Sequence, residues 1–450
     1  MRAPRTDRGR LLLVLALVTA VTVFTATVPL LRDWFDLRVY HGTVDSWING
    51  DGRVYDYRVP GTPYGFTYPP FAAVVMLPMA LVGLGTAIVA ALLLNLAALA
   101  LAARVLAGPG WRRHGWYGVA LGACALALFE PLRDTFSFGQ VNILLLALVL
   151  TDCLLLSTGR TRWAGIGIGL AAAIKLTPAL FIGLLLLARR PRAAAVATGT
   201  AVAATALAAL IAPDASRFYW TSALWDTTRV GRLDYVSNQS LQGVLARLGV
   251  ESRPVWAVLA AAVLAVWAWR SRRAAAAGDW QAAFALTGLT ACLVSPITWV
   301  HHLVWLLPSF AVLVRAGHPR VAGALYAVLC TSVVWLWFDD ASGVDGFLGG
   351  NLYTWITLGL LLWLPAGQPA GLRRPTRRSS SATPVPPSTA APAIRPASGQ
   401  PGPSSAGAAE ATGTTGGPGR GRARNASSEP TGATRPAAAN PQSSSSRASS

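Results

Sequence analysis

Apolar runs close to twenty residues long recur along this chain, and they constrain its fold more than any other feature. The first occupies residues 11–31 and another occupies residues 86–107. A helix of this length spans the roughly 30 Å hydrocarbon core of a bilayer, and a segment in lipid must satisfy its own backbone hydrogen bonds. With 53% hydrophobic and 13% charged residues, the sequence predicts an all-α, polytopic membrane protein.

The distribution of arginine predicts the topology of the chain. A net charge of +19 would ordinarily suggest a nucleic-acid partner, but the arginines lie mostly in the C-terminal tail and in short loops of one parity. Such loops are typically cytoplasmic and face anionic lipid. We therefore expect membrane lipids and no nucleic acid as partners, with about twelve crossings of the plasma membrane and both termini inside.

The expected crossings follow one another with few long connections. The N-terminus resembles a signal peptide, but its apolar run is too long for one, so we expect a retained first span at 11–31. Residues 67–84 are expected to form an interfacial or re-entrant helix, and 32–67 and 213–253 to form large outer loops. The other expected spans are 86–107, 116–130, 140–157, two short limbs within 163–188, 193–212, 254–270, 281–297, 303–316, 321–338 and 351–365.

The apolar segment 163–188 is interrupted at its middle by Lys175, the only lysine in the sequence. Arginines flank both of its ends, which predicts that both ends are cytoplasmic. Each limb of about 12 residues covers some 18 Å, which is too short to cross a bilayer. We therefore expect a hairpin with Lys175 at its apex, broken near Pro178 because proline cannot donate a backbone hydrogen bond.

A cation inside the membrane costs roughly 3 kcal/mol, so Lys175 indicates a functional site. At the apex it would lie at the bottom of a cavity that opens outward, where an anion such as a lipid phosphate is its natural partner. The alternative is that Lys175 extends its side chain to a nearby interface and has a purely structural role.

Two terminal regions are expected to lie outside the membrane domain. Residues 1–10 form a short cytoplasmic N-terminus. Residues 367–450 are rich in Ser, Pro, Ala, Gly and Arg and almost lack large apolar side chains. Such a tail cannot bury a core, so we expect it to be disordered and cytoplasmic.

The four cysteines give no sign of a metal or redox site. Cys124, Cys153, Cys292 and Cys330 lie within apolar runs or at their ends and lack metal-ligand spacing. We expect them to be small core residues without a disulfide or zinc. No motif in the sequence indicates a cofactor.

Polar residues at the expected outer ends of the spans are the candidates for chemistry. Asp36 follows the first span among apolar and aromatic neighbours that could partly desolvate it, so its carboxylate could act as a general base. The alternative is a solvated acidic loop shared with other aspartates. Helix capping is the alternative for Arg133, Gln140 and Asn142, interfacial anchoring for Tyr40 and Tyr68, and a structural role for the paired His301 and His302.

Six short motifs together resemble glycosyltransferase family 87. They are DLRVY at 36–40, FTYPPF at 66–71, FGQVNILLLAL at 138–148, AGIGIGLAAAIKLTPALF at 164–181, NQSLQG at 238–243 and SPITWVHH at 295–302. The family comprises polyprenyl-phosphate-mannose-dependent α-mannosyltransferases of actinobacteria with a GT-C fold. The resemblance covers residues 10–366, so it implies a GT-C-like domain at 11–366 and leaves the tail out.

The resemblance implies inverting transfer of mannose, with α-1,2 linkage, from polyprenyl phosphate mannose to a lipid-linked glycan on the extracytoplasmic face. Asp36 matches the catalytic carboxylate that GT-C enzymes carry in the first outer loop. Lys175 and Arg133 would bind the donor phosphate. The sugars would be oriented by Tyr40, Tyr68, Gln140, Asn142, Asn238, Gln239, His301 and His302.

Two other functions remain open at this point. The donor sugar could be another one, such as arabinofuranose, because no residue pattern reads the stereochemistry of hydroxyl groups. A flippase or carrier for a lipid-linked saccharide would also need an intramembrane cation and a polar cavity. It would not need a carboxylate beside an acceptor hydroxyl.

Overall fold

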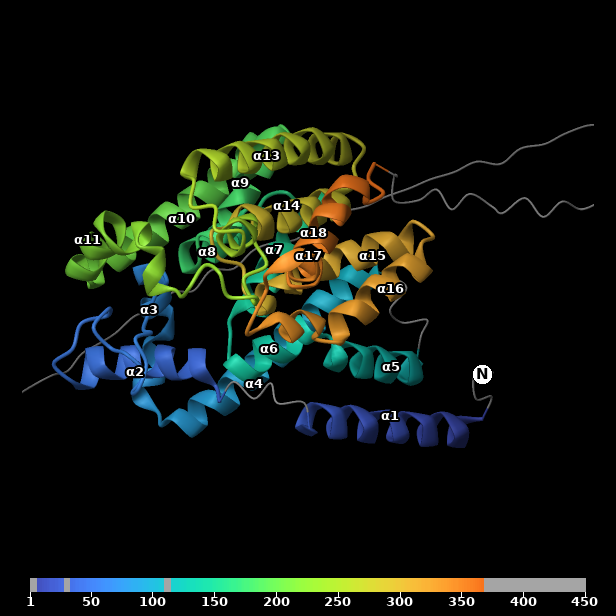
Figure 1. Cartoon of the computed structure of the whole chain (residues 1–450). Coiled ribbons are helices and arrows are strands. Elements are labelled where there is room, and N and C mark those ends of the chain that lie inside the picture. Colours follow the sequence, from blue (N-terminus) through green and yellow to red (C-terminus); the bar gives the residue numbers. More distant parts are fainter. Residues whose placement is uncertain (1–5, 28–32, 109–114, 368–450) are drawn as a thin grey trace, which may run out of the picture. The chain divides into compact units, whose positions relative to one another are not determined.

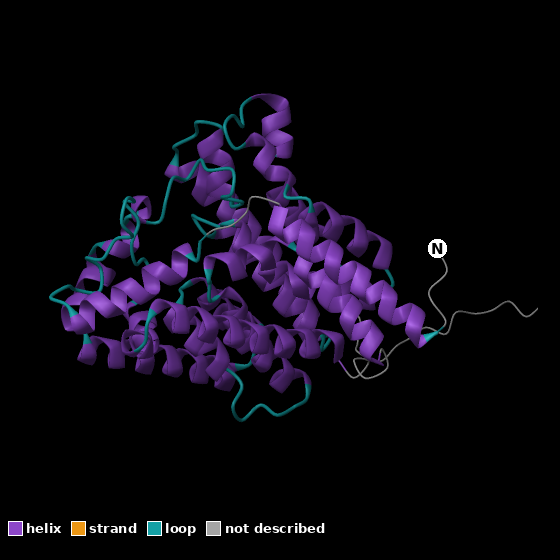
Figure 2. Cartoon of the chain, turned by 90° about the horizontal axis from the view of Figure 1, so that it is seen from below, coloured by secondary structure: helices purple, strands orange, loops and turns teal. Residues whose placement is uncertain are grey.

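A computed structural model describes residues 6–27, 33–108 and 115–367 of the chain. Regular secondary structure in these residues is helical throughout (Figures 1 and 2), which confirms the all-α prediction. The only β-bridge among them is the isolated pair of Arg58 and Gly65. Almost all of the tail and the first five residues lie outside the described residues, so the predicted disorder of the tail stays a prediction.

The helices are named in chain order, and η marks a 3-10 helix. They are α1 (Asp7–Thr27), α2 (Phe35–Asn49), α3 (Pro70–Met76), η1 (Leu77–Leu81), α4 (Leu84–Ala107), α5 (Gly115–Leu128), α6 (Glu130–Phe138), α7 (Asn142–Ser157), α8 (Ile166–Ile174), η3 (Thr177–Ala179), α9 (Leu180–Leu187), α10 (Pro191–Ile211), α11 (Pro213–Thr221), η4 (Ala223–Trp225), η5 (Thr227–Arg229), α12 (Leu241–Arg247), α13 (Arg253–Ala276), α14 (Trp280–Val294), η6 (Val300–Leu306), α15 (Leu307–Arg315), α16 (Pro319–Cys330), η7 (Val333–Trp337), α17 (Gly343–Gly349) and α18 (Leu352–Trp363).

Four of these helices, α1, α4, α10 and α13, are long and apolar enough to cross a membrane. The pair α5 and α6 passes the same test together, although it bends by 73° at the break between them. α1 has no buried residue and exposes its leucines, as expected of a helix that faces lipid. These features identify a membrane protein.

Most of the other predicted spans are present as shorter apolar helices, so the number of crossings is not confirmed. They have 10–17 residues, and examples are α7, α14 and α18. The predicted span 303–316 is divided at Leu306, where η6 ends and Pro308 enters the first turn of α15.

The segment around Lys175 folds back on itself, as predicted. α8 runs in the same direction as α10, since Gly165 lies against Ala193 and Gly169 lies against Ala197. α9 ends at Leu187, shortly before α10 begins at Pro191, so both ends of the segment lie at the start of α10. Lys175 is the C-cap of α8 in an extended conformation.

A buried carboxylate explains where α8 begins. Asp152 on α7 accepts a hydrogen bond of 2.7 Å from the backbone nitrogen of Ile168 in the first turn. Gly165 precedes the helix with φ 112, a conformation that favours glycine. A Cβ on Gly167 would approach the carbonyl oxygen of Leu148 to 2.3 Å, so the glycine also allows α8 to lie close to α7.

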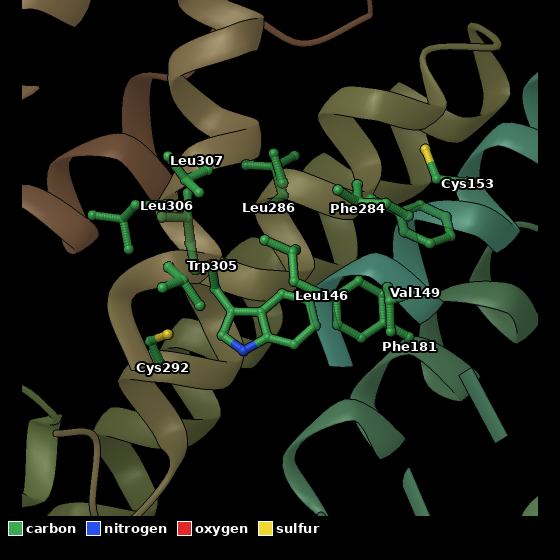
Figure 3. Packing of buried hydrophobic residues seen from close by; sticks show 14 of the residues in the cluster. Leu146, Val149, Cys153, Phe181, Phe284, Leu286, Cys292, Trp305, Leu306 and Leu307 are labelled. Atoms are coloured by element: carbon green, nitrogen blue, oxygen red, sulfur yellow. The ribbon is translucent and has the colours of Figure 1, made fainter. Parts of the chain in front are cut away.

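The largest apolar core joins α7, α9, α14 and η6. Figure 3 shows Trp305, Phe181 and Phe284 interleaved with leucines from these helices. The ring centroids of Phe181 and Trp305 are 5.4 Å apart. Cys153 and Cys292 lie in this core as free thiols, in keeping with their prediction as small core residues.

A second apolar core lies under α2, which occupies part of the predicted first outer loop. Leu37, Tyr40 and Val44 lie on one face of this helix and are buried. They pack with Phe66 and Tyr68, which come just before α3. From the sequence we expect only a large outer loop here and name no helix, although the spacing of these residues is typical of a helix.

Candidate functional site

A cavity of about 640 Å³ lies where α2, the end of α6 and the Lys175 turn meet the segments after α11 and α14. Asp36 and Lys175 both line it, as do Gln140, His301 and His302. The remaining lining comes from residues 35–40, 64–69, 134–138, 176–180, 219–237 and 291–300, with Trp335 and Phe338. With Tyr40 and Tyr68, which line it too, the cavity brings together seven of the predicted site residues from segments far apart in the sequence.

The position of Asp36 depends on the contact between α2 and the end of α6. The backbone nitrogen of Trp34 donates a hydrogen bond of 3.0 Å to the carbonyl of Ser137. Gly139 then turns the chain with φ 70, and a Cβ at this position would lie 2.5 Å from the Cβ of Leu37. Only glycine fits this turn without a shift of α2. The next residue, Gln140, is therefore held beside Asp36.

The carboxylate of Asp36 accepts a hydrogen bond from the side chain of Gln140 and feels the positive charge of Lys175. Burial is the larger influence and raises the pKa of Asp36 to about 6. A carboxylate with such a pKa is ionised at neutral pH and accepts a proton more readily than an ordinary aspartate. This is the property required of a general base.

Lys175 is held by three polar side chains. Its Nζ lies 3.0 Å from Oδ1 of Asn142 and 3.3 Å from the hydroxyl of Tyr68. The Nε2 atom of His302 lies 2.8 Å from the same nitrogen. The nitrogen also lies 5.0 Å from the ring centroid of Tyr68. The side chain is therefore fixed at the cavity wall and does not extend toward an interface.

Hydrogen bonds connect the lysine to the aspartate across the cavity wall. Tyr68 accepts from Lys175 and from Tyr40, whose hydroxyl is 3.0 Å away, and donates to Oε1 of Gln140 at 2.8 Å. This fixes the amide of Gln140 with its nitrogen toward Asp36. Burial raises the pKa of Tyr68 well above its usual value, so its hydroxyl remains a neutral donor.

The two histidines occupy neighbouring positions in η6 and differ in their contacts. His302 contacts Lys175, and its Nδ1 accepts a hydrogen bond of 3.1 Å from the backbone nitrogen of Trp299. The ring of His301 lies edge-on to Phe138, with centroids 5.1 Å apart. Its carbonyl accepts hydrogen bonds from Thr135 and from Asn142. η6 is thereby fastened to the α6–α7 turn that carries Gln140.

Four predicted site residues do not line the cavity. Asn142 lies behind Lys175, where it orients the amine. The guanidinium of Arg133 bonds to the Ser332 hydroxyl at 2.9 Å and to the carbonyl of Cys330. Asn238 and Gln239 are buried and bond to backbone groups of the segments that begin at Pro296 and Gly350. Asn238 and Gln239 therefore hold loop segments together through their hydrogen bonds.

Other residues of the cavity were not singled out from the sequence as site residues. Arg229, from the second outer loop, lines the cavity, and nothing in the sequence distinguishes it from the other arginines. An aromatic group forms another part of the lining, in which the ring centroid of Tyr235 is 6.3 Å from those of Trp299 and Phe338. Aromatic faces of this kind can stack on sugar rings.

Among the described residues, no group of three or more His, Cys, Asp or Glu side chains is arranged to hold a metal ion. The charged groups available at the cavity include a carboxylate, an amine and a guanidinium. Together they can accept a proton from a hydroxyl group and stabilise the negative charge of a phosphate.

Comparison with known proteins gives a consistent result. A model of glycosyltransferase family 87 matches residues 66–296. A relative from Mycobacterium tuberculosis is 33% identical over 387 residues, which cover 79% of this chain and 90% of the relative. It is named a polyprenol-phosphate-mannose-dependent alpha-(1-2)-phosphatidylinositol mannoside mannosyltransferase.

Two relatives from Mycolicibacterium smegmatis are similarly close. One is 34% identical over 63% of this chain and 70% of its own length, and it carries the same name. The other is 35% identical over 71% of this chain and 79% of its own length, and it is named for a phosphatidylinositol pentamannoside acceptor. No solved structure matches the chain.

Proposed function

Because the chain belongs to glycosyltransferase family 87, as its motifs predicted, we propose that it is a membrane mannosyltransferase. It transfers mannose from polyprenyl phosphate mannose to a phosphatidylinositol mannoside or a similar lipid-linked glycan, forming an α-1,2 linkage with inversion. The family and the names of the relatives support the class of enzyme, the donor and the kind of acceptor.

The observation that carries this proposal is the meeting of Asp36 and Lys175 in one cavity. Asp36 carries a raised pKa of about 6 and faces the cavity from α2. Lys175 is fixed by side chains of three other segments. A transferase for a phosphate-activated sugar needs a base for the acceptor hydroxyl and a cation for the leaving phosphate, and this cavity supplies both.

In the proposed reaction, Asp36 removes the proton from an acceptor hydroxyl as its oxygen attacks the anomeric carbon of mannose. The bond between that carbon and the phosphate oxygen breaks, and its electron pair leaves with the polyprenyl phosphate. The additional negative charge on the phosphate is stabilised by Lys175. The proton remains on Asp36 until it exchanges with water, which completes the balance of the reaction.

The neighbouring polar groups orient these two residues and the sugars. Gln140 and Tyr68 fix the distance between the base and the cation through their hydrogen bonds. His301 and the hydroxyl-bearing Tyr40 line the cavity where a sugar would lie. His302 and Asn142 hold the amine in place. We assign no role in binding to Arg133, Asn238 or Gln239, because none of them lines the cavity.

We further propose that residues 11–366 form a GT-C-like domain with about twelve crossings of the plasma membrane, and that the cavity opens on the extracytoplasmic face. The arginine distribution supports this topology, and so do the shorter apolar helices at the positions of the predicted spans. In this topology the residues before α1 and after α18 lie in the cytoplasm.

The test is an assay with purified protein, radiolabelled polyprenyl phosphate mannose and a phosphatidylinositol mannoside. The expected result is a labelled product with one additional α-1,2-linked mannose and release of polyprenyl phosphate. Polyprenyl phosphate arabinofuranose, supplied in its place, should give no product. Movement of the donor between leaflets without any new glycosidic bond would instead identify a flippase.

A further inference from the structure

A second pocket, of about 430 Å³, lies beside the first between residues 53–58 and α11. Three arginines line it, namely Arg53, Arg58 and Arg229. Two carboxylates, Asp56 and Asp214, line it as well, and the rest of the wall is apolar. Nothing in the proposed function uses this pocket, so its charge calls for an explanation.

None of the three arginines forms an ion pair with another described residue. Arg58 donates one hydrogen bond of 2.6 Å to the carbonyl of Pro63. Arg229 lies over the ring of Phe218 at 5.2 Å, and its buried Nε has no hydrogen-bond partner among the described residues. A buried guanidinium nitrogen without an acceptor is costly, so the pocket has unused capacity to bind an anion.

The location of this pocket indicates which anion it would meet. α11 begins two residues after α10, an apolar helix long enough to cross the membrane, so the pocket lies near the end of a candidate span. Arg229 lines both pockets, which makes the second one a neighbour of the cavity that holds Asp36. A membrane lipid whose glycan enters the cavity would have its phosphate close to this position.

We propose that Arg53, Arg58 and Arg229 bind the phosphodiester of the glycolipid acceptor, while the glycan of the same lipid extends into the Asp36 cavity. This inference rests on the proposed function and adds a binding site for the acceptor. Guanidinium groups suit the site because their planar donors bind phosphate oxygens in pairs. The donor phosphate is held separately at Lys175.

Two carboxylates, Asp56 and Asp214, also line the pocket, and removing a negative charge should have the opposite effect on acceptor binding to removing an arginine. The side chain of Asp56 accepts a hydrogen bond from the backbone nitrogen of Arg53 and has a structural role. Asp214 lies in the first turn of α11, and its side chain forms no hydrogen bond or ion pair with another described residue. Substituting it should therefore remove its charge without breaking a structural contact. Its negative charge opposes that of a phosphate, so removing it should strengthen acceptor binding.

The experiment compares two acceptors in neutral detergent. One is a phosphatidylinositol mannoside, and the other is an octyl α-mannoside, which has no phosphate. We expect the double variant Arg53→Gln with Arg58→Gln to raise KM for the phosphorylated acceptor about tenfold. The KM for octyl mannoside, the KM for the donor and kcat should stay as in the unchanged protein. Asp214→Asn should lower KM for the phosphorylated acceptor alone.

Arg217→Gln serves as the matched control, because this exposed arginine lies on α11 outside the pocket. It should leave both acceptors unaffected. An equal loss with both acceptors in the double variant would overturn the proposal, and so would an increased KM for the donor alone. If the unchanged protein transfers mannose to neither acceptor, the proposed function fails, and this result is distinct from a failure of the arginine site.

Discussion

Asp36 and Glu130 are alike in sequence and differ in what surrounds them. Each lies in the first turn of a helix, α2 or α6, and each lies near a basic side chain, Lys175 or Arg133. Glu130 is fully buried, and its two oxygens accept hydrogen bonds of 2.6 Å from Trp335 and 2.5 Å from Tyr353. Asp36 lines a cavity and has the amide of Gln140 as its hydrogen-bond donor.

The difference separates a structural carboxylate from a reactive one. Glu130 uses its hydrogen-bonding capacity to join α6 to η7 and α18, so neither oxygen is available to a substrate. Asp36 keeps accepting capacity on the cavity side, and burial raises its pKa to about 6. The two basic side chains differ in the same way. Arg133 donates to the hydroxyl of Ser332 and has a structural role, whereas Lys175 lines the cavity.

The largest expected effect comes from removing the proposed base. Asp36→Asn preserves the shape of the side chain but cannot accept a proton, so we expect kcat to fall by about 10²–10⁴-fold. Binding of the donor should remain. Steady-state transfer of labelled mannose measures kcat, and titration with the donor measures donor binding. Glu130→Gln is the matched control and should retain transfer at low temperature. Turnover of Asp36→Asn near that of the unchanged protein would remove the base assignment.

The second prediction compares the two cations. Lys175→Met replaces the amine by an apolar group of similar length, so the donor phosphate loses a charge-assisted contact and donor KM should rise about tenfold or more. Arg133→Met should leave donor KM unchanged, because Arg133 does not line the cavity. Donor titration at saturating acceptor measures both values. Equal increases of donor KM in Lys175→Met and Arg133→Met would contradict the assignment of donor binding to Lys175 and not to Arg133.

How far the sequence predicts this site depends on whether a residue carries a local signal. Lys175 stands out because charge is rare within apolar segments, and Asp36 because it follows the first span. Gln140 stands out because it is a polar residue at the expected end of a span and belongs to the motif at 138–148. These residues could be predicted because the sequence immediately around each of them is enough to distinguish it.

Other parts of the site depend on contacts between distant segments. Asn238 and Gln239 were predicted to bind sugars, yet their amides bond to backbone groups of residues as distant in sequence as Pro296 and Thr354. Arg229 carries no local signal, and only the packing of the second outer loop brings it to the cavity. The helical architecture could be predicted from the long apolar runs. The number of crossings stays a prediction, because many of the predicted spans are helices of 10–17 residues, too short to be assigned by length.

The third prediction tests Glu130 as a structural residue. Glu130→Gln replaces one of the two accepting oxygens by an amide NH₂ group that faces a donor, Trp335 or Tyr353, so the free energy of unfolding should fall by about 2 kcal/mol. Thermal unfolding in detergent should show a lower midpoint, with donor and acceptor KM unchanged below it. Asp36→Asn should leave the midpoint unchanged or raise it, because the remaining oxygen can still accept from Gln140 while the cost of burying a charge is removed. A lower midpoint for Asp36→Asn than for Glu130→Gln would reverse the assignment of the two carboxylates.

The smallest expected effect is that of replacing Gln140, whose side-chain amide donates a hydrogen bond to Asp36. Gln140 donates to the carboxylate and favours its charged form, which holds the pKa near 6 against the effect of burial. Since the base acts only when ionised, kcat should fall as the pH decreases through about 6 in the unchanged protein. In Gln140→Leu the donor is lost, the pKa of Asp36 rises, and the same decrease should occur at a higher pH. The pH dependence of single-turnover transfer between about pH 5 and pH 9 measures the shift. If kcat in Gln140→Leu fell at the same pH or at a lower one, Gln140 would not control the charge of Asp36. The difference between Asp36 and Glu130 would then depend on burial and Lys175 alone.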